Sequence, residues 1–169
     1  MADTPLVDNR LKASVAHLEN FIFQEIDESR AACAIGQTDL QHFFVPTNAE
    51  YGCGMYSRQL TVPKDLLFTG KIHRHAHMTF LLKGELLVTS ETGRKHIKAP
   101  HTWVTPCGAK RAFYALEESI LTNVHLTKHP QLEKLQQIED EVIAPSYTEM
   151  GLAEACLLYT SPSPRDSDS

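Results

Sequence analysis

Three histidines spaced two residues apart stand near the middle of the chain: His73, His75 and His77 in the run GKIHRHAHMTFLL. The run favours a β-strand, in which alternate side chains leave the same face, so we expect the three imidazoles to point one way, about 6.6 Å apart in succession. A His-x-His pair can ligate a single metal ion, and imidazole suits zinc, copper, iron and nickel. One strand rarely supplies three ligands to one ion. A further ligand is therefore expected from a neighbouring strand, where His125 in ILTNVHLT is the candidate.

Cations accompany these imidazoles in the sequence. Lys71 stands two residues before the histidine run, Arg111 begins RAFYAL, and strand parity puts Arg58 on one face with Tyr56. A guanidinium that stays protonated cannot donate a lone pair to a metal, and it offers fork-shaped donors to a carboxylate or phosphate. The residues therefore also predict an anion pocket lined by imidazoles. The alternatives are packed or solvated histidines, and an exposed strand face on which Lys71 and Arg111 pair with nearby carboxylates.

Short β-rich runs separated by turns occupy residues 55 to 127. Pro-Lys-Asp, Lys-Gly, Thr-Gly and Pro-Cys-Gly sequences divide this region into seven or eight strands, a spacing typical of an antiparallel sandwich or barrel. Apolar residues at helical spacing predict an amphipathic helix over residues 6–35 and a second over 131–143. The sequence thus predicts a mainly β protein, a barrel flanked by two helices.

Length and composition set the class of protein. The 169 residues, 42% hydrophobic and 22% charged, indicate about one ordinary globular domain. Sixteen basic against 21 acidic residues give a net charge of −5, which disfavours a nucleic-acid polymer or an anionic membrane as a partner. The N-terminus has no signal-peptide pattern and no apolar run has the roughly 18 residues that span a bilayer. A cytoplasmic location with free thiols is expected.

Four segments are expected along the chain. Residues 1–50 form an N-terminal helical segment, 51–130 the barrel and 131–155 a C-terminal helix. Residues 156–169, CLLYTSPSPRDSDS, change composition abruptly and resemble the translation of a sequencing-library adapter, as found at the ends of metagenomic contigs. On that interpretation the true C-terminus is missing; the alternative is a natural Ser/Pro-rich tail.

Two longer motifs carry a family resemblance. GKIHRHAHMTFLLKGELLV, followed by KAPHTWVTPCGAKRAFYALEESILTNVH, resembles the cupin superfamily and, more narrowly, small uncharacterised cupin-like proteins encoded by bacteriophages. The resemblance covers residues 52–143. It implies a single jelly-roll barrel. Cupins of this kind commonly pair, so a homodimer is expected. The apolar stripe of the helix at 6–35 must then be covered by the barrel or contribute to the contact between the two copies.

The resemblance also implies a departure from the metal-binding pattern. Counted from Gly84 and from Pro106, the metal-ligand positions of cupins fall on residues of which two are cations: Lys71, His73, His77 and Arg111. If the register is moved by two residues, His73 and His75 form the His-x-His pair and Thr79 takes the position of the usual Glu. Arg111 still occupies the position of the last ligand. In either register the metal set is incomplete.

The first functional hypothesis is a binding protein without a cofactor. A small anionic or nucleotide-like ligand lies in the barrel with its charge toward Arg111, Lys71 and Arg58, while His73, His77 and His125 supply hydrogen bonds. The phage resemblance suggests that such a binder sequesters a host metabolite or defence signal in the host cytoplasm.

Two other classes remain open. In a metal-dependent cupin enzyme, an oxygenase, isomerase or lyase, histidines from the set His73, His75, His77 and His125 hold zinc, iron, manganese or nickel while Arg111 anchors a substrate carboxylate. In a structural or virion-associated protein the barrel is packed shut. Fold alone does not choose among the three.

Overall fold

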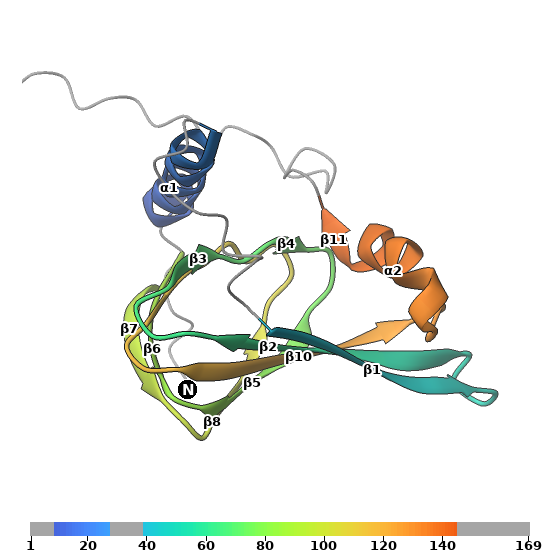
Figure 1. Ribbon diagram of the computed structural model, residues 1–169. Helices are drawn as coiled ribbons and strands as arrows, with labels where there is room; N and C mark the ends of the chain where they lie inside the picture. The colour runs from blue at the N-terminus through green and yellow to red at the C-terminus, as the bar shows by residue number, and fades with distance from the viewer. Residues whose placement is uncertain (1–8, 28–38, 145–169) are drawn as a thin grey trace, which may run out of the picture.

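Two antiparallel sheets face each other in the computed structural model, which describes residues 9–27 and 39–144 (Figure 1). The predictions for residues 1–8, 28–38 and 145–169, including the tail at 156–169, lie outside the described residues. The five-stranded sheet has the order β1 (Asp39–Asn48), β2 (Cys53–Val62), β10 (Ser119–Thr127), β5 (His77–Lys83) and β8 (His101–Thr105). The four-stranded sheet has the order β3 (Leu67–Thr69), β9 (Ala112–Ala115), β6 (Glu85–Ser90) and β7 (Gly93–Lys98). A small third sheet joins β4 (Ile72–His73) to β11 (Ile143–Ala144).

The core lies between the two large sheets because their strands alternate buried and exposed residues. Val62, Leu81, Leu86 and Ala115 have no exposed surface and form its centre. Gly84, between β5 and β6, has φ +88°, and a Cβ there would collide with Ser119, so this turn requires glycine. The mainly β jelly-roll class that the sequence predicts is confirmed.

The helices cover the barrel on one side of the five-stranded sheet (Figure 1): α1 (Asn9–Asp27), and α2 (Leu135–Val142), which follows the 3₁₀ turn η2 (Leu132–Lys134). Both lie within the predicted helical spans. In α2, Ile138 and Val142 are buried against Tyr56 and Phe44, so this helix lies against the inner face of the β1–β2 hairpin. Among the described residues, no helix is long and apolar enough to cross a membrane.

The prediction of a helical segment over residues 1–50 is wrong for its last part, because a ten-residue strand, β1, runs from Asp39 to Asn48. It pairs antiparallel with β2 through a tight turn in which the Asn48 side chain accepts hydrogen bonds from the backbone N–H groups of Glu50 and Tyr51, at 2.9 and 3.2 Å. The barrel strands therefore begin at residue 39 and not at 51. Most side chains of this strand are exposed, so its apolar residues do not alternate with polar ones as they do in a strand with one buried face.

A buried ion pair fixes α1 on the barrel. The Nζ of Lys110, whose side chain is 7% exposed, lies 2.7 Å from Glu19 Oε1 and donates a second hydrogen bond to the carbonyl of Gly70 at 2.9 Å. The hydroxyl of Thr69 donates to the same carboxylate at 2.7 Å. Next to this contact, Val15 of α1 is 2% exposed. The apolar stripe of α1 is therefore used at least partly within the chain.

We expect Lys110→Ala to lower the free energy of unfolding by about 3 kcal/mol, because it leaves the Glu19 carboxylate without its buried partner. Lys83→Ala is the matched control: its pair with Glu118, at 2.7 Å, is more than half exposed on both sides, and such pairs contribute at most about 1 kcal/mol. Urea denaturation followed by circular dichroism measures both. Equal losses in the two variants would contradict the role given to Lys110.

Candidate metal centre

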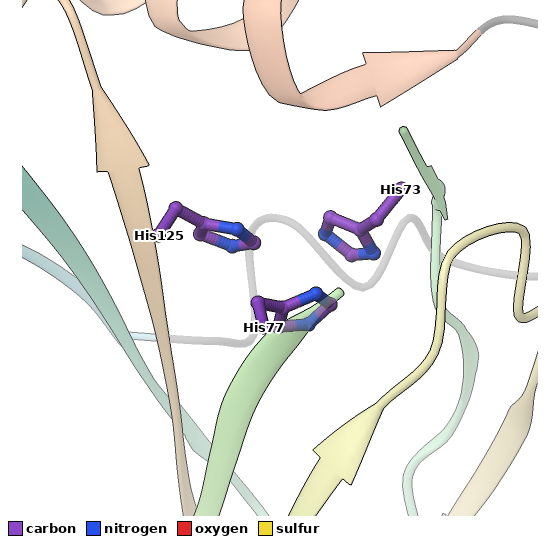
Figure 2. A group of neighbouring side chains, drawn as sticks. All are labelled: His73, His77 and His125. Carbon is purple, nitrogen blue, oxygen red and sulfur yellow. The ribbon is translucent and has the colours of Figure 1, made fainter. Parts of the chain in front are cut away.

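Three histidines from three strands meet inside the barrel: His73 of β4, His77 at the start of β5, and His125 of β10 (Figure 2). Their potential ligand nitrogens all lie within 4.8 Å of one another. The ring centroids are 4.3 Å apart for His73 and His77, 4.3 Å for His77 and His125, and 5.0 Å for His73 and His125. Three imidazoles with converging nitrogens are a donor set for a transition metal.

The backbone holds each histidine from a different direction. His77 lies opposite Thr105 of β8, and His125 lies opposite Tyr56 of β2. His73 pairs with Ile143 of β11, and its carbonyl accepts a hydrogen bond from Gly108 N at 2.9 Å. Figure 2 shows α2 and β11 above the three rings. The site therefore depends on the sheet from below and on the C-terminal elements from above.

His75 is not part of this cluster, which corrects the expectation of one continuous strand through His73, His75 and His77. The chain bends between β4 and β5 because β4 pairs with β11 whereas β5 pairs with β10 and β8. Alternation is lost across the bend, and His75 is exposed. The histidines that meet are four residues apart in sequence, not two.

Burial keeps these imidazoles neutral. It is the main cause that lowers the pKa of His73 to about 3, and the neighbouring His77 lowers it further. The pKa of His125 is likewise lowered to about 3, first by burial and then by His77 and Arg58. Burial also lowers the pKa of His77. A neutral imidazole has a free lone pair, so the ligands need no deprotonation at neutral pH.

Arg111 lies on the inner side of the barrel next to this cluster. Its Nη1 donates a hydrogen bond to Thr105 Oγ1 at 3.1 Å, and its charge helps to keep the pKa of His77 low. Its Nε is buried and has no hydrogen-bond partner among the described residues. Arg58 of β2 is half-buried and acts on the pKa values of both His73 and His125. The cluster is thus flanked by two guanidinium groups, one of which has a free donor.

Lys71 and Tyr56 are placed differently from the pocket roles that the sequence suggested. The Lys71 side chain is 53% exposed and forms an ion pair with Glu139 of α2 at 3.5 Å, so its partner is a surface carboxylate. Tyr56 is buried beside His125, with ring centroids 6.3 Å apart, and its hydroxyl shares a 2.8 Å hydrogen bond with His42 Nδ1. Tyr56 therefore packs against a histidine of the cluster, and its polar atom already has a partner.

One buried polar residue in the barrel, Glu91, was missed from the sequence. Glu91 is 5% exposed, and its Oε2 has no hydrogen-bond partner among residues 9–27 and 39–144. Its charge opposes the lowering of the Arg111 pKa by burial. Trp103 packs against the core, and within the part of the chain that the structure describes its Nε1 has no hydrogen-bond partner either. Glu91 stands in a Ser-Glu-Thr-Gly turn, which predicts an exposed side chain, so no sequence signal marked it. Buried polar atoms without partners are rare and indicate room for a water or a ligand group.

A cavity of about 390 Å³ lies elsewhere, between α1 and the four-stranded sheet. Its lining includes Leu18, Leu67, Leu87 and Tyr114, with Arg94 among its polar residues. None of the three clustered histidines lines it.

Comparison with known proteins gives similarity in structure alone. No family model matches this chain, and no curated protein matches it. A conserved Streptococcus pyogenes protein of unknown function is 15% identical over 65% of this chain and 76% of its own, with a TM-score of 0.42. A cupin superfamily protein from Desulfitobacterium hafniense is 8% identical (52% and 77% covered, TM-score 0.41). An RmlC-like cupin from Shewanella frigidimarina is 16% identical (59% and 98%, TM-score 0.39).

These similarities assign no ligand and no activity. The facing sheets of this chain, with histidines of three strands meeting between them, have the architecture of a jelly-roll barrel.

Proposed function

We propose that this chain is a metal-dependent cupin enzyme that holds one divalent transition metal at His73, His77 and His125 and acts on a small organic anion. The convergence of three imidazoles, two buried (His77 and His125) and one half-buried (His73), with potential ligand nitrogens within 4.8 Å of one another, carries the proposal. Nitrogens bonded to one ion at about 2.1 Å lie roughly 3 to 3.5 Å apart, a separation within reach of small ring rotations in this cluster.

The chemistry of the donor set fits such an ion. All three ligands are neutral imidazoles, which suit zinc, iron, nickel and copper, and three protein ligands leave a coordination position for a further group. A bound ion supplies Lewis acidity toward a carbonyl or carboxylate oxygen. The protein's own residues supply a partly desolvated environment, which is the main cause of the low pKa values of His73 and His125.

An anionic substrate is supported by the arginines. Arg111 has a buried Nε without a partner, and among the described residues Arg58 has no hydrogen bond or ion pair. A carboxylate accepts paired hydrogen bonds from a guanidinium, which is the geometry for which arginine is suited. Lys71, paired with Glu139 at the surface, is left out of this binding set.

Metal analysis tests the proposal. The full chain, purified without a metal-affinity column, stripped with EDTA and offered zinc, manganese, nickel or iron(II) in turn, should retain about one equivalent of at least one metal after gel filtration. Elemental analysis measures the ratio of metal to protein. Retention of no metal by correctly folded protein would overturn the proposal.

A second experiment addresses the anion, with oxalate as a probe. On metal-loaded protein, Arg111→Ala should weaken oxalate binding by about 2 to 4 kcal/mol, because a charge-assisted contact inside a partly dry site is lost. Lys71→Ala, the control, should change the affinity less than twofold because Lys71 faces Glu139. Calorimetry measures both. Unchanged binding in Arg111→Ala would show that the anion is held elsewhere.

A metal-free binding protein is the second candidate, and the free donor of Arg111 favours it. In that case the histidines donate hydrogen bonds to an anionic ligand, and the phage resemblance gives the protein a role in sequestering a host metabolite or defence signal, which needs affinity without turnover. The metal analysis separates the two candidates.

A further inference from the structure

The cavity of about 390 Å³ lies outside the barrel, between α1 and the outer face of the four-stranded sheet, where α1 contacts β3 and β6 (Figure 1). Small-molecule sites in proteins have volumes of about 300 to 1,000 Å³. The cavity is separate from the core, because Leu87 stands between Leu86 and Val88, the two β6 residues of the core cluster. We call it the outer groove and define it by six of its lining residues: Leu18, Leu67, Leu87, Arg94, Lys95 and Tyr114.

The floor of the outer groove is largely apolar. Strand register places Leu67, Tyr114, Leu87 and His96 side by side across β3, β9, β6 and β7, a row about 14 Å long. Leu67 and Leu87 are 41% and 43% exposed. The Tyr114 hydroxyl donates a hydrogen bond to Asp65 Oδ1 at 3.0 Å, so its polar atom already has a partner. Exposed apolar side chains in a concave site favour an apolar ligand group.

Helix α1 forms the wall of the outer groove. The neighbouring row of the sheet contains Thr69, Ala112, Thr89 and Arg94. Thr69 is bound to Glu19 of α1, and Ala112 is 7% exposed, so the first part of this row is covered. The row then reaches β7, where Arg94 is exposed. The outer groove is therefore bounded by the helix and the sheet, and its end at β7 faces solvent.

The solvent end of the outer groove is basic. Arg94, Lys95 and Lys98 stand within the six residues of β7, although the whole chain has a net charge of −5. Glu85 pairs with His96 and Lys98. Among the described residues, the side chains of Arg94 and Lys95 have no hydrogen bond or ion pair. An unpaired guanidinium beside an apolar floor is complementary to a carboxylate attached to an apolar body.

We propose that the outer groove is a second ligand site, which binds a small amphipathic carboxylate. The apolar body lies on Leu67 and Leu87, and the carboxylate lies at the β7 end, where it accepts hydrogen bonds from Arg94 with Lys95 beside it. The bounded volume limits the occupant to a small molecule. The site does not depend on a metal or on the function proposed for the histidine centre, because none of the clustered histidines lines it.

Calorimetry with decanoate as the probe, kept below its micelle concentration, tests the proposal. The full chain is stripped with EDTA so that no carboxylate binds through a metal. About one equivalent of decanoate should bind. Octanoate should bind about tenfold more weakly because it buries two fewer methylene groups, and 1-decanol should bind at least about tenfold more weakly because it has no charge for Arg94. Correctly folded protein that binds no decanoate, or that binds 1-decanol equally well, would overturn the proposal.

Leu87→Glu should weaken decanoate binding by at least about 100-fold, because it places a carboxylate on the apolar floor. Leu82→Glu is its matched control: Leu82 is 53% exposed on β5 of the other large sheet, and the affinity should change less than twofold. Circular dichroism verifies the fold. Leu87→Thr keeps a strand-forming residue, should weaken binding to an intermediate degree, and covers failure of the glutamate variant to fold.

The charge of the ligand is tested by Arg94→Glu, which should weaken decanoate binding at least about tenfold because attraction becomes repulsion. Lys134→Glu, at an exposed position in η2, makes the same change in net charge and should change the affinity less than twofold. Binding that is unchanged in both Arg94→Glu and the Leu87 variants would overturn the proposal by placing the ligand elsewhere. Equal losses in Arg94→Glu and Lys134→Glu would also overturn it, since only the net charge of the protein would then matter.

Discussion

His73→Ala, His77→Ala and His125→Ala should each lower metal affinity by at least about 100-fold, because each removes one of three imidazole ligands and the remaining pair binds a divalent ion weakly. The measurement is a competition titration with a chromophoric chelator at pH 7. The effect should be similar for all three variants, although they lie on three different strands. Variants that act only through packing should differ in their loss of metal affinity, because the three side chains have different surroundings.

His75→Ala is the control for that series. It removes an imidazole from the same segment of chain, but His75 is exposed and outside the cluster. Its metal affinity should stay within about twofold of the wild type. If His75→Ala lost metal as severely as the other variants, the segment between β4 and β5 would adopt a different register when metal binds, and the ligand set proposed above would be wrong.

Acid should destabilise the metal-free protein well above the pH at which its carboxylates protonate. His73 and His125 have a pKa of about 3 in the folded chain against 6.5 when unfolded. Their neutral forms therefore favour folding fully above pH 6.5, and the stabilisation is lost as the pH falls from 6.5 toward 3. Between pH 7 and pH 5 each of these histidines should lower the free energy of unfolding by about 2 kcal/mol, since one pKa unit corresponds to about 1.4 kcal/mol.

Urea denaturation of EDTA-treated protein at pH 7 and at pH 5 measures this loss. His73→Gln should reduce the difference between the two pH values by about 2 kcal/mol, because one of the groups that take up a proton on unfolding is gone. His101→Gln, at an exposed position on β8, should leave the difference unchanged. A wild-type stability that is flat between pH 7 and pH 5 would contradict the burial assigned to these rings.

The barrel could be predicted because its signals are local. Turn residues such as those around Gly84 mark strand ends, and alternation marks which side of a strand is buried. The strand at Asp39–Asn48 was missed because most of its side chains are exposed, so the burial that normally produces alternation is weak there. The helices were predicted in type, since their apolar spacing is also local.

The site was harder to predict because its geometry is not local. Strand parity favoured His75, and only the pairing of β4 with β11, seventy residues apart for His73 and Ile143, breaks the strand and excludes it. Lys71 and Arg111 are equally plausible cations in the sequence. Lys71 pairs at the surface with Glu139 because of where α2 lies. Arg111 is buried beside Thr105 of β8, a contact that the sequence does not reveal. Burial of a polar residue such as Glu91 has no sequence signature.

The pairing of β4 with β11 also bears on how quickly a bound ion could leave. His73 lies on a two-residue strand held by Ile143, and the next amide, Arg74 N, bonds to the carbonyl of Val142 at 2.9 Å. Short elements with few pairing contacts open far more often than a whole domain unfolds. Fraying of α2 and β11 would free one ligand while the other two stay on the large sheet. The residence time of the ion would then follow the opening rate of the C-terminal elements rather than the unfolding rate of the barrel.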